Sequence, residues 1–406
     1  MPHEAALIGT IAVSLAFAFI GGFVAVQLRL PPLVGYLLAG IAVGAFTPGF
    51  VADRHLAPQL AEIGVILLMF GVGLHFSVRD LLAVRGVAVP GAIVQIMVAT
   101  GLGVGVAYWW GWSTSSGFVF GLALSVASTV VLLRALEARG HLSSDEGRIA
   151  VGWLIVEDLV MVVALVLLPA LAGPLQGAGT GSGHAAASTL WATLGLTLGK
   201  IAAFIGLMLV AGTRIFPRLL IHVERTGSRE LFTLAVVALA LGLAFAAAEL
   251  FGVSFALGAF FSGVVINQSD LSHRAATDSQ PLQDVFAALF FVAVGMLFDP
   301  RILVQRPVEV ISVLAIIIFG KSLAAFGIVL ALGYPRREAL TVAAALSQIG
   351  EFSFILAELG MSLHLLSAEA YSLILAGSIF SIAVNPLGFA AVSSLRTSRG
   401  RLQPAS

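Results

Sequence analysis

The chain has 406 residues, of which 59% are hydrophobic and 10% are charged, whereas a typical soluble domain has about 25% charged residues. This composition excludes a soluble domain with a single anchor and indicates a polytopic membrane protein. The formal net charge is zero, which gives no indication of nucleic acid as a partner, and the absence of cysteine excludes disulfides and thiolate metal sites.

Hydropathy along the chain predicts an all-α protein with about thirteen transmembrane helices, since one crossing needs roughly 20 apolar residues. Three segments are short, so twelve is an alternative count. The first segment has no basic residues before it and is too long for a signal peptide, so we expect a retained helix. The predicted segments are residues 5–27, 33–46, 57–75, 87–108, 117–136, 149–169, 189–212, 231–248, 252–267, 285–298, 308–332, 337–359 and 367–392.

The positions of the arginines test this count independently. With thirteen helices and the N-terminus outside, sixteen of the nineteen arginines fall on one side of the membrane, and only Arg54, Arg301 and Arg306 fall on the other. Connections rich in arginine are retained in the cytoplasm. We therefore expect a multi-pass protein with an external N-terminus and a basic cytoplasmic tail, residues 393–406.

The sixth segment carries two adjacent acids, Glu157 and Asp158, at its midpoint. A charge at the centre of a membrane helix costs about 2.5–3.5 kcal/mol on the insertion scale, and such residues usually face a cavity or a partner. Successive helix residues point about 100° apart, so one carboxylate can face water while the other meets a protein neighbour. Burial favours the neutral acid and a nearby cation favours the carboxylate, which suits a proton-binding site. The alternative is a hydrogen-bonded pair that only ties helices together.

The two lysines of the chain, Lys200 and Lys321, also lie within predicted helices rather than in loops. Lys321 suits a counter-ion to an acid, either permanently or only when the transported ion is absent, and a buried lysine can also carry a proton itself. A purely structural ion pair is the alternative. For Lys200, in the helix that links the two halves of the chain, we expect a structural or interfacial role.

Segments five and twelve resemble each other. Residues 123–140 read ALSVASTVVLLRALEARG and residues 345–360 read ALSQIGEFSFILAELG, and both place small and polar residues at mid-membrane depth. The odd separation of seven segments inserts the two copies in opposite orientations, as in the inverted repeats of transporters, whose interrupted helices form the ion site. Chance similarity and ordinary packing by small and hydroxyl residues are the alternatives. The polar residues that would line the two interruptions are Ser125, Ser128, Thr129, Ser347, Gln348, Gly350 and Glu351.

The predicted domains follow from this symmetry. Residues 1–172 would form the first inverted repeat and residues 230–392 the second. Residues 173–229 between them would supply an external loop, a linking helix and a basic cytoplasmic loop.

Motifs for catalysis are absent from the sequence. It contains no glycine-rich phosphate loop after a strand, no HExxH or EF-hand pattern and no potassium-channel filter. An intramembrane aspartyl protease would need two aspartates in different helices, and Asp158 is the only one at mid-membrane depth. We therefore expect a protein that is not an enzyme and that holds no resident metal.

Five stretches together make the sequence resemble the monovalent cation:proton antiporter-2 family, in particular the Kef-type potassium/proton antiporters of the YbaL-like branch. The resemblance covers essentially the whole chain. It implies a homodimer in the bacterial inner membrane, in which each subunit has a dimerisation domain and a mobile core domain where two interrupted helices cross beside the acidic helix. The stretches are LAEIGVILLMFGVGLHFS (60–77), ALSVASTVVLLRAL (123–136), GWLIVEDLVMVV (152–163), LFFVAVGMLFDP (289–300) and SQIGEFSFILAELG (347–360).

The resemblance also implies roles for single residues. Asp158 would bind the cation or a proton, Glu157 would occupy the variable position before it, and Lys321 would pair with an acid when no ion is bound. Kef-type proteins usually have Gln at the position of Glu157, which leaves the cation and the stoichiometry open. They also usually continue into a cytoplasmic nucleotide-binding regulatory domain; a nucleotide would belong there, so no cofactor is expected in this chain. Residues 267–284 resemble a gating loop of that group, with a plain polar connector as the alternative.

Together these features predict a secondary transporter that exchanges a monovalent cation, with K⁺ as the first candidate, for H⁺ by alternating access in the lipid bilayer. A Na⁺/H⁺ antiporter and a symporter or channel-like cation carrier on the same fold are the alternatives. A non-transporting structural or sensor subunit is a further one.

Overall fold

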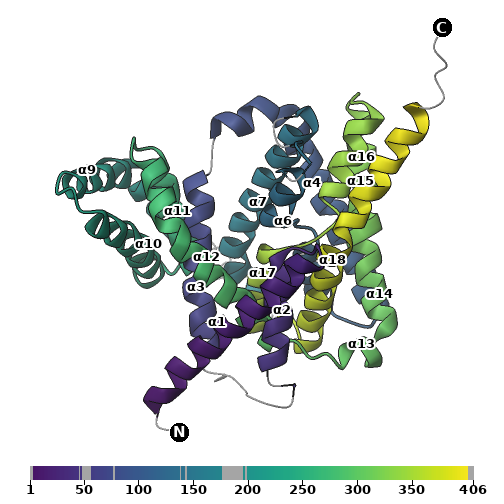
Figure 1. The fold of residues 1–406 in the computed structure, drawn as a ribbon, viewed down its shortest axis with the longest axis horizontal. Coiled ribbons are helices and arrows are strands. Elements are labelled where there is room, and N and C mark those ends of the chain that lie inside the picture. The colour runs from purple at the N-terminus through teal and green to yellow at the C-terminus, as the bar shows by residue number, and fades with distance from the viewer. Residues whose placement is uncertain are drawn as a thin grey trace, which may run out of the picture. The chain divides into compact units, whose positions relative to one another are not determined.

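The computed structural model describes residues 3–44, 46–47, 56–75, 78–137, 139–141, 144–175, 195–196 and 199–400. Within these residues every regular element is helical, as the sequence predicts (Figure 1). The elements are α1 (His3–Gln27), α2 (Pro32–Val43), α3 (Leu56–His75), α4 (Val78–Trp109), α5 (Thr114–Leu124), α6 (Thr129–Glu137), α7 (Asp145–Leu175), a π-helical turn (Met208–Gly212), α9 (Thr213–Glu224), α10 (Arg229–Phe251), α11 (Phe255–Asn267), α12 (Ser272–Met296), α13 (Ile302–Gln305), α14 (Pro307–Ala315), a second π-helical turn (Ile316–Gly320), α15 (Lys321–Ala331), α16 (Arg336–Ala345), α17 (Glu351–Ser362) and α18 (Ala368–Gly400).

Nine helical stretches of the described part are long and apolar enough to cross a membrane, so the chain is a multi-pass membrane protein. Three shorter apolar helices accompany them, at residues 32–43, 59–75 and 255–267. The stretch from Arg336 to Ser362, which a break divides into α16 and α17, is not among the nine. The count of about thirteen helices therefore stays a prediction.

The chain divides into two compact units, each assembled from segments far apart in the sequence. Unit 1 consists of Met1–Phe23, Gly35–Ser77 and Val162–Leu297, and unit 2 consists of Val24–Val34, Val78–Met161 and Phe298–Ser406. Each unit therefore draws on both of the predicted repeats. The repeats themselves are a statement about evolutionary symmetry and stay a prediction.

Unit 1 is packed through close approaches of helix backbones. A Cβ on Gly73 of α3 would lie 2.1 Å from the carbonyl oxygen of Phe260 on α11, and a Cβ on Gly263 of α11 would lie 2.2 Å from that of Phe70 on α3. Glycine at both positions lets the two backbones touch, the usual way in which membrane helices gain packing area.

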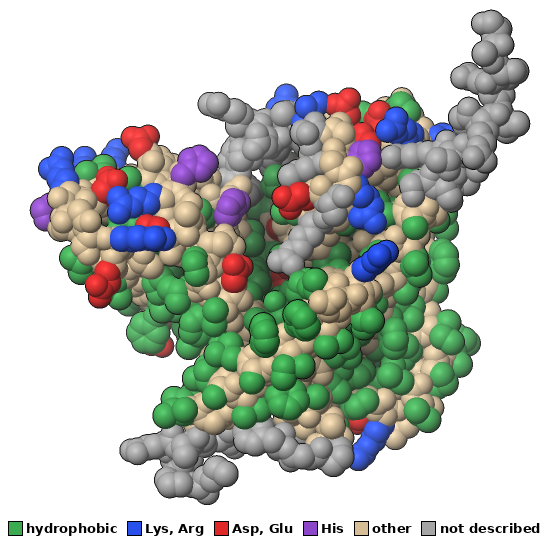
Figure 2. All heavy atoms as spheres, viewed as in Figure 1, with side chains coloured by type: hydrophobic (Ala, Val, Ile, Leu, Met, Phe, Trp, Pro, Cys, Tyr) green, Lys and Arg blue, Asp and Glu red, His purple; other side chains and the backbone are tan. Residues whose placement is uncertain are grey.

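Charged side chains gather at one end of unit 1. Arg274 on α12 bonds to Glu224 on α9 (3.1 Å), and Arg229 at the start of α10 bonds to Asp278 on α12 (2.9 Å). Figure 2 shows this concentration of charge over α9 and the neighbouring helix ends, with hydrophobic side chains over the rest of that unit's visible face. Lys200 also belongs to unit 1, where it is exposed within the helical stretch 199–224.

Unit 2 contains both helices that the sequence predicts to be interrupted. α5 ends at Leu124 and α6 begins at Thr129, while α16 ends at Ala345 and α17 begins at Glu351. We call residues 125–128 the first break and residues 346–350 the second break. The acidic part of α7 and the lysine at the start of α15 lie in the same unit, around an apolar core in which Trp153 is the largest buried side chain.

Candidate functional site

The first break turns its backbone groups toward buried side chains of α4 and α7. The carbonyl oxygen of Ser125 accepts a hydrogen bond from Nε2 of Gln95 (2.8 Å), and the backbone N–H of Ala127 donates to Oε2 of Glu157 (2.8 Å). The hydroxyl of Ser125 donates locally to the carbonyl of Leu122 (2.7 Å) and so takes no part in the polar cluster. Buried backbone groups need such partners, because an unpaired one costs about as much as a lost hydrogen bond.

The two breaks meet at Ser128 and Gln348. The backbone N–H of Ser128 donates to Oε1 of Gln348 (2.9 Å), and Nε2 of Gln348 donates back to the carbonyl oxygen of Ser128 (3.1 Å). Gly350 packs against the same serine: a Cβ there would lie 2.3 Å from the Cβ of Ser128. Residues that the sequence places more than two hundred positions apart are thus brought into direct contact at mid-helix.

The second break is held by donors from α15 and α18. Nζ of Lys321 donates to the carbonyl oxygen of Gln348 (2.9 Å). Nδ2 of Asn385 donates to the carbonyl oxygen of Ala344 (2.8 Å) and to Oγ of Ser347 (3.1 Å). Ser378 adds a longer hydrogen bond to the carbonyl of Ile349 (3.3 Å).

Glu157 and Asp158 lie at the first break with one carboxylate oxygen each left over. Oδ2 of Asp158 accepts from the hydroxyl of Thr129 (3.2 Å), the first residue of α6. Within the described residues, Oδ1 of Asp158 and Oε1 of Glu157 accept no hydrogen bond of normal geometry, although Gln95 and Trp153 lie close to the carboxyl group of Glu157. Glu157 is fully buried and Asp158 is only 7% exposed.

A third acid, Glu351, joins this cluster from α17. Its Oε2 accepts from the hydroxyl of Ser128 (2.9 Å), next in sequence to the threonine that bonds Asp158. Glu351 and Glu157 both act electrostatically on Asp158. Two adjacent hydroxyl residues at the start of α6 therefore serve two carboxyl groups from different helices.

Lys321 acts electrostatically on Glu157. Its hydrogen bond goes to the backbone of the second break, and among the described residues it forms no nitrogen–oxygen contact with an acid short enough to be an ion pair. The cluster therefore contains three acids and one lysine at the depth of the two breaks. The role of Lys321 as counter-ion stays a prediction.

The structure thus brings together every predicted site residue of unit 2. Sequence reasoning missed Gln95, Trp153, Ser378 and Asn385, which complete the hydrogen bonds of the two breaks. Of the two amides, Gln95 carried a usable signal, because residues 86–99 contain no other polar side chain.

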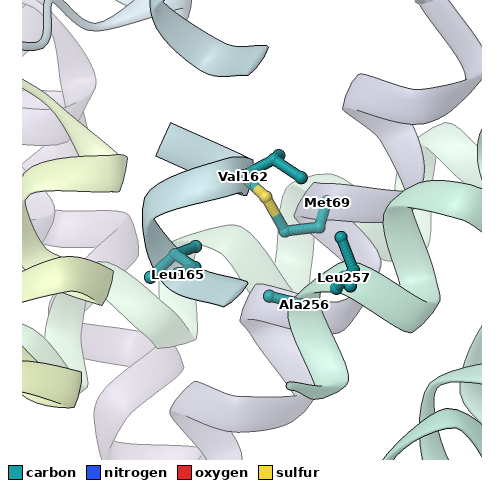
Figure 3. A pocket seen from close by; sticks show the side chains of 5 residues that line it. All are labelled: Met69, Val162, Leu165, Ala256 and Leu257. Atoms are coloured by element: carbon teal, nitrogen blue, oxygen red, sulfur yellow. The ribbon is translucent and has the colours of Figure 1, made fainter. Parts of the chain in front are cut away.

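The small hollow found in unit 1 is of a different kind. It is lined by Met69, Val162, Leu165, Ala256 and Leu257, and Figure 3 shows these apolar side chains around it. Such a lining of hydrocarbon and thioether groups offers no oxygen ligand for a monovalent cation.

Comparisons with known proteins agree with one another. Residues 15–394 match the family profile described as "Sodium/hydrogen exchanger, transmembrane". The chain is 60% identical over 390 residues to YbaL of Escherichia coli (strain K12), which carries the name of a cation/proton antiporter; the match covers 96% of this chain and 69% of YbaL. It is 32% identical over 388 residues to K(+) efflux antiporter 4 of Arabidopsis thaliana, covering 94% of this chain and 63% of that protein.

A solved structure shares the fold. The sodium proton antiporter MjNhaP1 from Methanocaldococcus jannaschii superposes with a TM-score of 0.73 at 17% identity, over 96% of this chain and 98% of that one. At this identity the likeness concerns the arrangement of the helices.

Proposed function

The chain belongs to the transmembrane sodium/hydrogen exchanger family, and on this premise we propose that it is a secondary transporter that exchanges a monovalent cation for protons at Asp158. The observation that carries the proposal is the unpartnered oxygen Oδ1 of Asp158, on a side chain that is only 7% exposed. Buried polar atoms without a partner are rare in proteins and call for an explanation. The explanation that we propose is that this oxygen binds a proton and a cation in alternation.

Competition for this carboxylate couples the two ions. A proton and a dehydrated cation are bound by the same oxygen lone pairs, so Asp158 holds one or the other. The empty carboxylate is charged and is costly to carry through a low-dielectric interior. Only the loaded, neutral site then changes its access from one side of the membrane to the other, which enforces exchange and excludes a leak.

The surroundings of Asp158 support a cation site. Thr129 begins the half-helix α6 and donates to Oδ2, and the N-terminal end of a helix favours a negative charge. Interrupted helices in transporters bring such ends and freed backbone carbonyls to the ion. Hydroxyl and carbonyl oxygens of the first break would complete the coordination.

Glu157 and Lys321 would then have a different task. We propose that Lys321 is the counter-ion of the site and that Glu157 is the acid whose charge it balances, since each acts on the other. Both also bind backbone groups of a break, which keeps them in place while Asp158 exchanges its ion.

Potassium is the first candidate for the cation, because relatives at 31–33% identity are named K(+) efflux antiporters. Alternating access, a homodimer and a position in the bacterial inner membrane with the N-terminus outside belong to the same proposal. Sodium is the second candidate, since the similar solved structure is that of a sodium proton antiporter.

Proteoliposomes with an internal pH dye test the proposal. We expect potassium, sodium or lithium gradients to drive an opposing proton flux through the wild-type protein, and Asp158→Asn to abolish that flux while the variant elutes as the wild type does. Glu249→Gln, an exposed acid at the end of α10, is the matched control and should exchange normally. Undiminished exchange in Asp158→Asn would remove the assigned residue. Cation flux without opposing protons would indicate a channel, and flux of both ions in one direction a symporter.

A further inference from the structure

Two fully buried side chains that the proposed exchange does not use, Gln95 and Trp153, form a hydrogen-bonded link to the first break and also lie beside the carboxyl group of Glu157. Nε1 of Trp153 on α7 donates to Oε1 of Gln95 on α4 (2.9 Å), and Nε2 of Gln95 donates to the carbonyl oxygen of Ser125 (2.8 Å). Ser125 is the C-cap residue that directly follows the end of α5 at Leu124. A chain of two hydrogen bonds therefore runs from α7 through α4 to the first break.

The chemistry of the three groups gives this chain a single direction. An indole N–H can only donate, and a backbone carbonyl can only accept. The amide between them must turn its oxygen toward Trp153 and its nitrogen toward Ser125. In the reverse orientation its NH₂ group would face the indole N–H, and its oxygen would face the carbonyl oxygen. Trp153 thus holds Gln95 in the one orientation that satisfies the carbonyl of the break.

Packing against α4 also fixes the position of the indole. Gly91 lies one turn before Gln95 on α4 and faces the ring of Trp153. A Cβ at this glycine would lie 2.2 Å from Cζ3 and 2.4 Å from Cη2 of the indole. The absence of a side chain at position 91 therefore provides the space in which the indole sits.

The same face of α7 carries Glu157, one turn after Trp153. Glu157 accepts the N–H of Ala127, so α7 holds the first break at two points, directly at Ala127 and through Gln95 at Ser125. Asp158 follows Glu157 and bonds to Thr129, immediately after the break. A shift of the break relative to α7 would therefore change the distance between Asp158 and the other oxygens around it.

We propose that Gln95 and Trp153 are positioning residues that hold the first break at the distance from α7 at which Asp158 takes a cation, and that they thereby set the affinity for the cation. This inference rests on the exchange at Asp158 proposed above. A cation needs several oxygen ligands at once, whereas a proton needs one. Loss of the hydrogen-bond chain through Gln95 should therefore weaken cation binding more than proton binding.

The test uses Trp153→Phe, which keeps a ring but removes the N–H, and Gln95→Leu, which removes the amide. We expect either variant to raise the cation concentration for half-maximal exchange by about tenfold, the factor that one lost buried hydrogen bond allows. The maximal rate at saturating cation should stay within about twofold of wild type, and so should the proton concentration for half-maximal exchange. The double variant should be no worse than Gln95→Leu alone, since both changes break one chain.

A matched control removes a side-chain hydrogen bond elsewhere. Oγ1 of Thr213, the first residue of α9, donates to the carbonyl oxygen of Leu209 (2.7 Å) within unit 1, so Thr213→Val deletes a side-chain to backbone hydrogen bond away from the site. It should leave the half-saturating cation concentration unchanged. The inference would be overturned if both test variants kept the wild-type cation concentration for half-maximal exchange. If their maximal rate and thermal stability fell while that concentration stayed unchanged, the hydrogen-bond chain would have a purely structural role. Absence of cation-driven proton flux in the wild type would instead overturn the proposed function.

Discussion

The first and second breaks lie in the same unit and touch at Ser128 and Gln348, but groups of opposite charge complete them. At the first break the carboxylate of Glu157 accepts a backbone N–H, that of Ala127. At the second break the ammonium group of Lys321 donates to a backbone carbonyl, that of Gln348.

The difference follows from the backbone groups that each break leaves unpaired. N–H groups are unpaired where α6 is about to begin, and carbonyls are unpaired where α16 has ended. Anions are stabilising at the first kind of helix end and cations at the second. Glu157 and Lys321 both bind backbone groups of broken helices, whereas Asp158 bonds no backbone group in the described contacts. Its free oxygen is the one that we propose for the ion.

The contact between the breaks should be the most sensitive point of this comparison. In Gly350→Ala the new Cβ would lie 2.3 Å from Cβ and 2.5 Å from Cα of Ser128, so the two breaks must separate. Such overpacking costs about 1–3 kcal/mol, and the paired hydrogen bonds between Ser128 and Gln348 would be lost with it. We expect no measurable exchange and a clearly lower melting temperature in detergent.

Gly327→Ala serves as the control, because nothing lies within 4 Å of a Cβ at that position of α15. Exchange and melting temperature should match the wild type. Normal exchange in Gly350→Ala would show that the two breaks do not need their present contact.

Removal of the cation from the second break should have the next largest effect. Lys321→Met leaves the carbonyl of Gln348 without its donor and Glu157 without its balancing charge. A buried hydrogen bond to a charged group contributes about 1.5–3 kcal/mol, so stability and exchange rate should both fall. Thermal unfolding and initial exchange rates measure the two effects.

The double variant Lys321→Met, Glu157→Gln sharpens this prediction. The amide oxygen of a glutamine can still accept the N–H of Ala127, and the unbalanced charge is gone. We therefore expect the double variant to be more stable than Lys321→Met alone. An equal or lower melting temperature would mean that Lys321 acts only through the backbone of the second break.

A neutral donor of the second break should matter less than the charged one. Asn385→Leu removes the hydrogen bonds to Ala344 and Ser347, but the carbonyl of Ala344 still accepts from the hydroxyl of Ser347 (2.8 Å), so the cost should be about 0.5–1.5 kcal/mol. The melting temperature should fall while the half-saturating cation concentration stays near that of the wild type. The reason is that Asn385 bonds the second break, whereas Asp158 lies at the first break. A raised half-saturation would place the cation nearer α18 than we propose.

The smallest effect is expected at Ser378, whose hydrogen bond to the carbonyl of Ile349 is the longest of the set (3.3 Å). Ser378→Ala should lower the stability by less than about 1 kcal/mol and leave exchange unchanged. A loss as large as that of Lys321→Met would show that the charge of the partner does not decide the strength of the second break.

The elements of the site were predictable where polarity is conspicuous. Glu157, Asp158 and Lys321 stand out in apolar segments, and the two stretches rich in small and hydroxyl residues are indeed the two breaks. Gln95 and Asn385 were missed because a single amide in a membrane helix commonly serves ordinary helix packing.

The acid on which the charge of Lys321 acts could not be predicted from the sequence. It depends on the register between α7 and α15, which are far apart in the sequence and are aligned only by tertiary packing. For the same reason hydropathy could not show that each compact unit would mix segments from both halves of the chain.

The side chain of Gln348 has a consequence for what this position can tolerate. It offers one donor and one acceptor to the N–H and carbonyl of Ser128, as a neighbouring β-strand would, so a helical membrane protein here contains a single rung of sheet-like pairing. Asparagine is one methylene too short to make that rung, and ionised glutamate has no hydrogen to donate. The carboxamide of Gln348 therefore acts as a spacer of fixed length between the two interrupted helices, beside the close contact of Gly350 with Ser128.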